Sequence, residues 1–416
     1  MNPIDLTAAR RIRSDDDWIA RARGLVPLLD GASARIEAAG ALTPDVLAAL
    51  HEARMFRMLL PRALDGAELD LATFFRVAST IAEGDASTAW CLVQSSGCAL
   101  SAAYLEPRTA QEVFGAPDAM LAWGFPSAEC RAVPVDGGWT VDGSWSFGSG
   151  NRHARWVGGH CRVCDADGRP LSSPGGKPVE RTMLLPRASV TVDQMGWNVV
   201  GLRGTGSDSY SVKGMFVPAA LSLVVRATGR DQHLAAGETG EPESERREHG
   251  TLYRFAPTSV YQCGFAGVAL GIAQATLNSL VDLATKKAPS GGRMLMRDNH
   301  VIQARIARSE ARLCASRAWL TEVLRDMWAA CAASGPVGFE HRIRLRLAAS
   351  HAFQEAREVL EHAYTDAGAT AIFESNPFER RMRDMHAVCQ QVQASPTHFE
   401  SVGQHRMGLK PNLRFI

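Results

Sequence analysis

The sequence has almost no net charge and no long uninterrupted hydrophobic run. It contains 45 basic and 44 acidic residues among 416, a formal net charge of +1, so no overall field attracts nucleic acid or an anionic membrane. The first 25 residues alternate in charge and lack the apolar core of a secretory signal. The longest apolar run, 259–277, is interrupted by Gln262 and Gln274. Its uninterrupted core is too short to span a membrane, so we expect a buried helix.

Disulfide frameworks, metal-ligand pairs and nucleotide-binding loops are also lacking. The nine cysteines share no repeated spacing, and their odd number in a large protein favours a reducing cytoplasm. Cys161 and Cys164 form a single C-x-x-C pair with no second pair at zinc spacing. We therefore expect two ordinary cysteines and no metal site. No strand–GxGxxG–helix unit and no P-loop occurs, which argues against a Rossmann site for NAD(P).

The hydrophobic period changes twice along the chain. Apolar residues recur at three- and four-residue steps over 15–115, which indicates helices. Over 118–222 they alternate, with Gly, Pro and Asp between short runs, as in an antiparallel sheet or small barrel. Long helical patterns then return and indicate a bundle. We predict an α+β, mainly helical fold: an N-terminal helical domain (1–116), a central antiparallel β-barrel-like domain (117–225), a flexible loop (226–250) and a C-terminal four-helix bundle (251–416).

A Gly-Ser-Gly sequence stands inside the strand region. Gly148, Ser149 and Gly150 follow Trp145 and Phe147 in "WSFGSG". Glycine weakens a strand unless another group must approach its backbone closely. A hairpin turn is the plain alternative, but it does not explain two glycines on either side of a serine. The sequence therefore indicates a close approach to this backbone.

The order of the three regions and four of its segments resemble a known fold. The segments are "GSWSFGSGNRHARW" (143–156), "GWNVVGLRGTGSDSYSV" (196–212), "NPFERRMRDMHAV" (376–388) and the helical stretch 60–90. From about residue 20 to 410 the chain resembles the acyl-CoA dehydrogenase superfold. Within it, the chain is similar to the oxygenase component of two-component flavin-dependent monooxygenases.

The resemblance implies an activity and its partners. Reduced FMN or FAD would arrive from a separate NAD(P)H:flavin reductase, and O2 would react with it to form a flavin hydroperoxide. One oxygen atom would pass to a small aromatic or heteroaromatic substrate. The resemblance further implies a cytoplasmic homotetramer, a dimer of dimers. The substrate pocket would be lined by helices around 85–100, 255–270 and 386–400.

The resemblance also implies which residues contact the flavin. Gly148 and Gly150 would leave room for the ring, and the Ser149 hydroxyl would bond to the nitrogen beside the oxygen-reacting carbon. Arg383 and Asp384 would brace the cofactor loop. Other contacts would come from Trp123, Phe125, Trp197, Arg203, Thr205 and Ser207, from Arg293 at the phosphate of a neighbouring subunit, and from Gly368, Ser375 and Asn376 at the phosphate end. Trp123 and Phe125 could equally be core aromatics, 203–207 a β-turn, and Arg293 a solvated helix residue. Ala369 replaces a usual glycine, which favours FMN over FAD.

The candidate acid–base residues separate oxygenation from dehydrogenation. An acyl-CoA dehydrogenase needs a carboxylate base, but its two usual positions fall on or beside Gln391 and Val392, and near Tyr261, and none of these is acidic. This argues against dehydrogenation, which remains the alternative activity, as does a non-catalytic interaction protein. Related oxygenases often carry a histidine where Gln391 stands. His386, His398 and His153 are candidates to replace it, since imidazole titrates near neutrality. Alternatively, the substrate needs no base.

Overall fold

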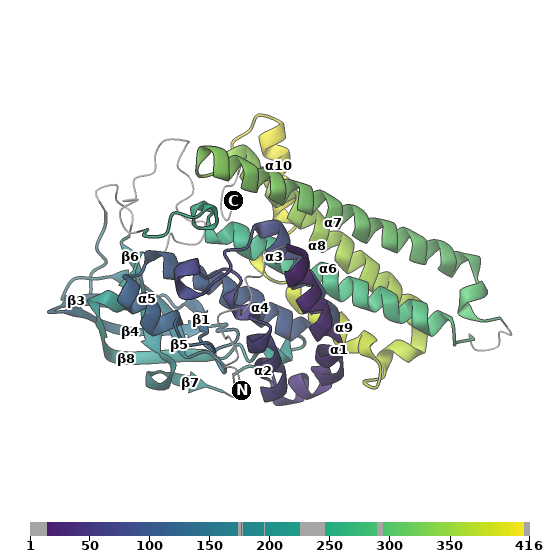
Figure 1. The fold of residues 1–416 in the computed structure, drawn as a ribbon, viewed down its shortest axis with the longest axis horizontal. Helices are drawn as coiled ribbons and strands as arrows, with labels where there is room; N and C mark the ends of the chain where they lie inside the picture. The colour runs from purple at the N-terminus through teal and green to yellow at the C-terminus, as the bar shows by residue number, and fades with distance from the viewer. Residues whose placement is uncertain are drawn as a thin grey trace, which may run out of the picture.

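The computed structural model describes residues 15–173, 176, 178–194, 196–224, 246–288 and 294–411. Most of the predicted loop 226–250 lies outside these residues. An N-terminal group of helices, a central sheet and a set of long C-terminal helices follow one another along the chain (Figure 1), as predicted. The helices are α1 (Asp15–Ala39), α2 (Pro44–Glu52), α3 (Leu71–Gly84), α4 (Ala86–Ala99), α5 (Pro107–Phe114), α6 (Pro257–Ala284), α7 (His300–Ser334), α8 (Phe339–Ala367), α9 (Pro377–Val388) and α10 (Thr397–Arg406).

The central sheet has nine strands, and its order is β7-β8-β4-β3-β5-β6-β9, with β1 paired to β5 and β2 to β4. The strands are β1 (Leu121–Trp123), β2 (Phe125–Pro126), β3 (Arg131–Val135), β4 (Gly138–Ser146), β5 (Trp156–Val163), β6 (Glu180–Pro186), β7 (Thr191–Asp193), β8 (Ser209–Pro218) and β9 (Ser222–Leu223). The prediction of an antiparallel sheet was wrong for two pairs, since β5 pairs in parallel with β1 and with β3. The sheet order explains why, because β3 lies between β4 and β5. The β4–β5 connection, 147–155, therefore skips a strand and carries Ser149 past the end of the sheet.

Helix α6 is the central element of the helical part. It packs against α3, α4 and α8 (Figure 1), and a stripe of glycines faces α3 and α4. A Cβ atom added at Gly264 would lie 2.6 Å from a Val93 methyl carbon, and one added at Gly271 would lie 2.1 Å from the Ser79 carbonyl oxygen. The small residues thus allow close helix contact. By length and composition α6 could cross a membrane, but 78% of its apolar window is buried within the protein.

Capping fixes how α4 faces the β4–β5 connection. Asp85 follows the last residue of α3, and its side chain accepts a hydrogen bond from the Thr88 N–H at 2.6 Å. An aspartate at this position satisfies a free N–H group of the first turn. Because α4 begins there, Trp90 lies in its second turn and reaches the turn that contains Ser149.

Candidate functional site

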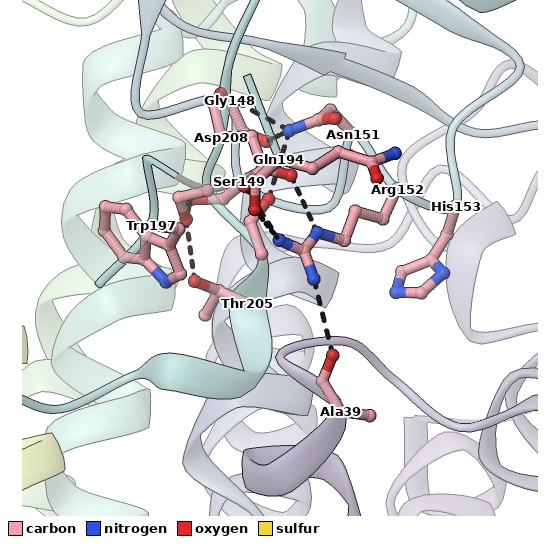
Figure 2. A network of polar contacts seen from close by, with 12 residues as sticks. Ala39, Gly148, Ser149, Asn151, Arg152, His153, Gln194, Trp197, Thr205 and Asp208 are labelled. Atoms are coloured by element: carbon pink, nitrogen blue, oxygen red, sulfur yellow. Dashed lines mark hydrogen bonds and ion pairs between the residues drawn. The ribbon is translucent and has the colours of Figure 1, made fainter. Parts of the chain in front are cut away.

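The turn after β4 is held to the segment before β8 by buried polar contacts. The Asn151 side-chain amide donates to the Gly148 carbonyl at 2.7 Å and to the Gly206 carbonyl at 3.1 Å. Arg152 forms a bidentate ion pair with the fully buried Asp208 carboxylate, at 2.7 and 2.9 Å. Figure 2 shows Ser149 and Asn151 on this turn, with Arg152 reaching across to Asp208 and to the carbonyls of Gln194 and Ala39. The two segments therefore form one rigid wall.

Packing explains the first glycine of this turn, and backbone conformation explains the second. A Cβ atom at Gly148 would lie 2.8 Å from the Tyr210 ring and 3.0 Å from the Asp208 carbonyl oxygen. Gly150 has φ +78°, a left-handed conformation that favours glycine. The close approach predicted from the sequence is thus made by Tyr210, and a ring lying against these glycines stays a prediction.

A chain of hydroxyl groups begins at Ser149. The Trp90 Nε1–H donates to Ser149 Oγ at 3.0 Å, and Ser149 Oγ lies 2.7 Å from Ser207 Oγ. Ser207 Oγ lies 2.7 Å from Thr205 Oγ1, which donates to the Leu202 carbonyl at 2.8 Å. Because the Thr205 proton goes to this carbonyl, Thr205 must accept from Ser207, and Ser207 from Ser149. Ser149 therefore offers a free lone pair and no free proton.

Ser149 lies on the wall of a cavity of about 1410 Å³ between the sheet and the helices. The lining includes Trp90 and Gln94 of α4, Pro257, Thr258, Tyr261 and Phe265 of α6, and His386, Ala387, Gln390, Gln391, Val392, His398 and Ser401 from α9 to α10. The helices around 85–100, 255–270 and 386–400, which were predicted to line the substrate pocket, all contribute residues to this cavity. From the sheet side come Trp123, Phe125, Phe147, Ser149, His160, Trp197 and Ser207.

Three aromatic rings of the sheet side form a row at the cavity. The Phe147 ring meets Phe125 and Trp197 edge-to-face, with centroid distances of 6.3 and 5.9 Å. Phe125 and Phe147 are 60% and 57% exposed, which is far more than residues of a hydrophobic core would be. Phe125 is thus not a core aromatic, whereas Trp123 is buried at 7% exposure beside His160. Such rings offer planar surface for stacking with a flat ligand.

Two residues of α9 hold the loop that carries Trp197. Arg383 donates to the Val200 carbonyl at 2.9 Å and pairs with Glu37 of α1 at 2.6 Å. Asp384 accepts from the Leu202 N–H at 2.6 Å. The loop is thus fixed to α9 and α1, and the role of Arg383 and Asp384 in bracing a cofactor loop stays a prediction.

Several predicted cofactor residues do not line the cavity. The Arg203 side chain is half-exposed and lies 3.7 Å from Glu37, and Thr205 is buried behind Ser207. Gly368, Ser375 and Asn376 lie in the connection between α8 and α9, away from the residues that line the cavity. Arg293 lies outside the described residues.

The candidate bases differ in their surroundings. His153 is not among the cavity-lining residues; it points away from Ser149 (Figure 2), and its Nε2 accepts from the Leu42 N–H at 3.0 Å. Its ring thus faces the segment between α1 and α2 that contains Leu42, outside the cavity lining, and no observation supports the prediction that it lies near a bound ring. His386, His398 and Gln391 do line the cavity. His386 is exposed, His398 is buried, and the Gln391 amide nitrogen is buried without a hydrogen-bond partner.

Sequence reasoning missed Trp90, Phe265 and Arg346. The Trp90 and Phe265 rings stack at 4.1 Å, and Phe265 stacks on Tyr261 at 5.8 Å. Arg346 of α8 lies 2.6 Å from His398 Nε2. Trp90 lies in one of the segments that carried the resemblance, and this could have identified it as a site residue. No local sequence pattern predicts that Arg346 of α8 contacts His398 of α10.

Among the described residues that line the cavity, no carboxylate is buried. Glu180 and Glu400 are its carboxylates, and neither is buried. Burial raises the pKa of Tyr261 well above its ordinary value, so this phenol stays protonated and is no base. These observations agree with the sequence argument against dehydrogenation, which needs a base beside the substrate.

Buried titratable groups at the site make stability depend on pH in opposite directions. Burial lowers the pKa of His160 to about 4 and raises the pKa of Asp384 to about 7. In the unfolded state His160 has its ordinary pKa, so the unfolded state binds more protons than the folded state between pH 4 and 6.5. The free energy of unfolding therefore decreases as the pH falls through this interval. Asp384 binds its proton more tightly when folded, so its contribution is lost as pH rises through 7.

We expect His160→Gln and Asp384→Asn to change the pH dependence with opposite signs. Between pH 6.5 and 4, the unfolding free energy of the wild type should fall relative to His160→Gln by up to about 3 kcal/mol. Relative to Asp384→Asn it should rise over the same interval. Urea unfolding at several pH values measures both, with the exposed His300→Gln as a control that leaves the wild-type profile unchanged. Parallel profiles for all four proteins would contradict the assignment.

The fold and site together define the class of protein. Residues 263–396 match the family model "Acyl-CoA dehydrogenase, C-terminal domain", and the described residues have an acyl-CoA dehydrogenase-like fold. The crystal structure of the HsaA monooxygenase from Mycobacterium tuberculosis superposes with a TM-score of 0.83 at 25% identity, covering 97% of this chain and 100% of that one. XiaF from Streptomyces, in complex with FADH2 and glycerol, superposes with a TM-score of 0.83 at 25% identity, over 95% of this chain and 96% of that one.

The curated relatives narrow the class. The oxygenase subunit HsaA of Mycobacterium tuberculosis, a flavin-dependent monooxygenase, is 28% identical over 96% of this chain and 97% of its own. The indole-3-acetate monooxygenase of Pseudomonas putida is 27% identical over 89% of this chain and 88% of its own. These relatives and the HsaA crystal structure are named as monooxygenases, the class of protein that the resemblance in the sequence predicted.

Proposed function

We propose that the protein is the oxygenase component of a two-component monooxygenase. It would take reduced FMN or FAD from a separate NAD(P)H:flavin reductase in the cytoplasm and oxygenate a small aromatic or heteroaromatic substrate. When bound, the reduced flavin supplies the electrons that activate O2. The observation that carries the proposal is Ser149, which lies on the wall of a large cavity with its proton committed to Ser207.

The cavity fits a flavin together with a second ring. Its volume of about 1410 Å³ exceeds the roughly 300–1,000 Å³ of pockets that hold one drug-sized ligand. Phe125, Phe147 and Trp197 supply flat surface on the sheet side, and Phe265 and Trp90 supply it on the helix side. These residues would hold the flavin ring and substrate and exclude water from the space between them.

The hydroxyl chain favours the reduced cofactor. The ring nitrogen N5 carries a hydrogen in reduced flavin and a lone pair in oxidised flavin. Because Ser149 donates to Ser207, it meets a ligand as an acceptor, which suits N5–H and opposes an N5 lone pair. Trp90 and Thr205 keep this direction, since Trp90 only donates and the Thr205 proton is bound to the Leu202 carbonyl.

The phosphate-end residues support a homotetramer. Gly368, Ser375 and Asn376 are absent from the cavity wall of their own chain. If they contact the cofactor, as the resemblance implies, they do so from a neighbouring subunit. We infer that the site is completed across subunits and that FMN, with its shorter tail, is the preferred cofactor.

Flavin binding in both redox states tests the proposal. We expect reduced FMN to bind about tenfold more tightly than oxidised FMN, since one buried polar group is satisfied in the first case and opposed in the second. Thr205→Val removes the acceptor for Ser207, frees the Ser149 proton and should bring the two affinities together. Anaerobic titration with reduced FMN and fluorescence titration with oxidised FMN measure them, with Thr191→Val on the exposed strand β7 as control. Absence of any flavin binding would sink the proposal.

The alternative, an acyl-CoA dehydrogenase-like enzyme, has a direct test. Such an enzyme would hold oxidised FAD tightly, and an acyl-CoA would bleach it anaerobically. We expect no bleaching, because the lining residues contain no buried carboxylate to take the substrate proton.

A further inference from the structure

Arg346 of α8 is a buried cation without a counter-charge. Its side chain is 1% exposed, its Nε has no hydrogen-bond partner, and no carboxylate of the described residues lies within ion-pair distance. Burial lowers its pKa to about 9, so it stays charged at neutral pH. A buried charge normally costs several kcal/mol unless it is paired. The fold keeps this one unpaired, which points to a missing anion.

His398 connects this charge to the cavity. Its Nε2 lies 2.6 Å from Arg346 Nη1 and 2.6 Å from the Val392 carbonyl oxygen. A guanidinium can only donate, so Nε2 accepts from Arg346 and cannot also donate to the carbonyl. The single proton of a neutral His398 then sits on Nδ1. Burial and the Arg346 charge lower the pKa of His398 to about 4, so the ring is neutral and a poor base.

The neighbouring cavity wall offers a second donor. The Gln391 amide nitrogen is buried without a partner, and Gln391 lines the cavity as His398 does. The carboxylate nearest in sequence, Glu400, is exposed and does not neutralise Arg346. Gln391 directly precedes Val392, whose carbonyl oxygen lies 2.6 Å from His398 Nε2, so this end of the cavity combines an unsatisfied donor with an uncompensated positive charge.

We propose that this end of the cavity binds a carboxylate group of the substrate, with His398 and Gln391 as donors and Arg346 as the counter-charge behind them. The inference rests on the proposed function for the rest of the substrate, a small aromatic ring. A carboxylate fits better than a phenol, because a carboxylate is ionised at neutral pH without help. A phenol would need a base, and His398 beside a guanidinium is unsuited to that task. His398 is therefore a substrate-binding residue.

The test compares acids with their uncharged amides on the full-length protein, with and without FMN. The probes are indole-3-acetate and phenylacetate, each against the corresponding acetamide, by calorimetry and by shift of the melting temperature. We expect the acids to bind roughly 10- to 100-fold more tightly than the amides, as a charge-assisted hydrogen bond provides. Arg346→Met should abolish this preference, and so should His398→Phe, which keeps a ring and removes the donor.

The controls separate a binding role from a structural one. Removing an unpaired buried charge should leave the ligand-free melting temperature of Arg346→Met equal to that of the wild type or above it. Arg344 lies on the same helix as Arg346, is exposed and pairs with Asp326 of α7; Arg344→Met should keep the full preference for acids.

Three results would overturn the inference: equal binding of acids and amides by the wild type, failure of both acids to bind, or an unchanged preference in Arg346→Met. Tighter binding of phenol than of either acid would also overturn it, in favour of a phenolate. Because binding is measured with and without FMN, the two proposals fail separately. Loss of flavin binding alone defeats the oxygenase proposal, and loss of the acid preference alone defeats this one.

Discussion

Replacing Ser149 with alanine is expected to shorten, by roughly 10- to 100-fold, the interval between oxygen consumption and hydrogen peroxide release by the protein–FMNH2 complex. The size is that of one lost hydrogen bond to a charged or strongly polarised group, about 1.5–3 kcal/mol. Ser149 is 5% exposed and is the only hydroxyl of the chain Ser149–Ser207–Thr205 that receives the Trp90 N–H. Ser149 is also the only residue of the turn 147–155 that both lines the cavity and has a side chain able to form a hydrogen bond.

Rapid mixing with oxygen, followed by a peroxidase-coupled assay, measures the interval. Ser149→Ala also leaves the Trp90 N–H without its partner, which should cost about 1–3 kcal/mol of stability. Trp90→Phe serves as a second variant, since it keeps Ser149 and removes its donor. Ser144→Ala, on an exposed position of β4, is the matched control and should behave as the wild type. A normal interval in a folded Ser149→Ala that still binds reduced FMN would show that Ser149 has no such role.

Adding one methyl group to helix α6 is expected to destabilise the whole protein. In Gly271→Ala the new Cβ would lie 2.1 Å from the Ser79 carbonyl oxygen and 2.6 Å from the Ala82 Cβ. Neither atom belongs to a flexible side chain, so α3 and α6 must move apart. Overpacking typically costs about 1–3 kcal/mol, and a clash with backbone lies at or above the upper end.

Chemical denaturation of Gly271→Ala and Gly24→Ala tests this expectation. Gly24 lies in α1, and a Cβ atom there would meet nothing within 4 Å. Since alanine is the better helix former, Gly24→Ala should gain about 0.5–1 kcal/mol. Similar effects of the two substitutions would contradict the close packing of α3 on α6.

Local patterns in the sequence were sufficient for the order of the regions and for part of the site. The change of hydrophobic period marked the passage from helices to strands, because each period reports which face of an element is buried. The WSFGSG segment singled out Ser149, which lies on the cavity wall, while its contact with a flavin stays a prediction. The parallel pairing of β5 with β3 was missed, since the period of a strand does not reveal the direction of its neighbour.

Contacts between distant segments explain the remaining differences. His153 was expected beside the ligand, but its Nε2 accepts a hydrogen bond from the N–H of Leu42, 111 residues earlier in the chain. The reason for Gly148 lies in the Tyr210 ring on β8. The Arg346–His398 contact joins two helices whose sequences carry no shared pattern. Such pairings follow from the assembled fold and leave no trace in local spacing.

The contacts of Arg383 connect helix α1 to the loop that carries Trp197, so we expect α1 to affect ligand affinity indirectly. Arg383 ties Glu37 of α1 to the Val200 carbonyl, although no residue of α1 is among those that line the cavity. Loss of α1 would release the segment that presents Trp197. A protein shortened at its N-terminus should therefore hold flavin more weakly even where its hydrophobic core survives.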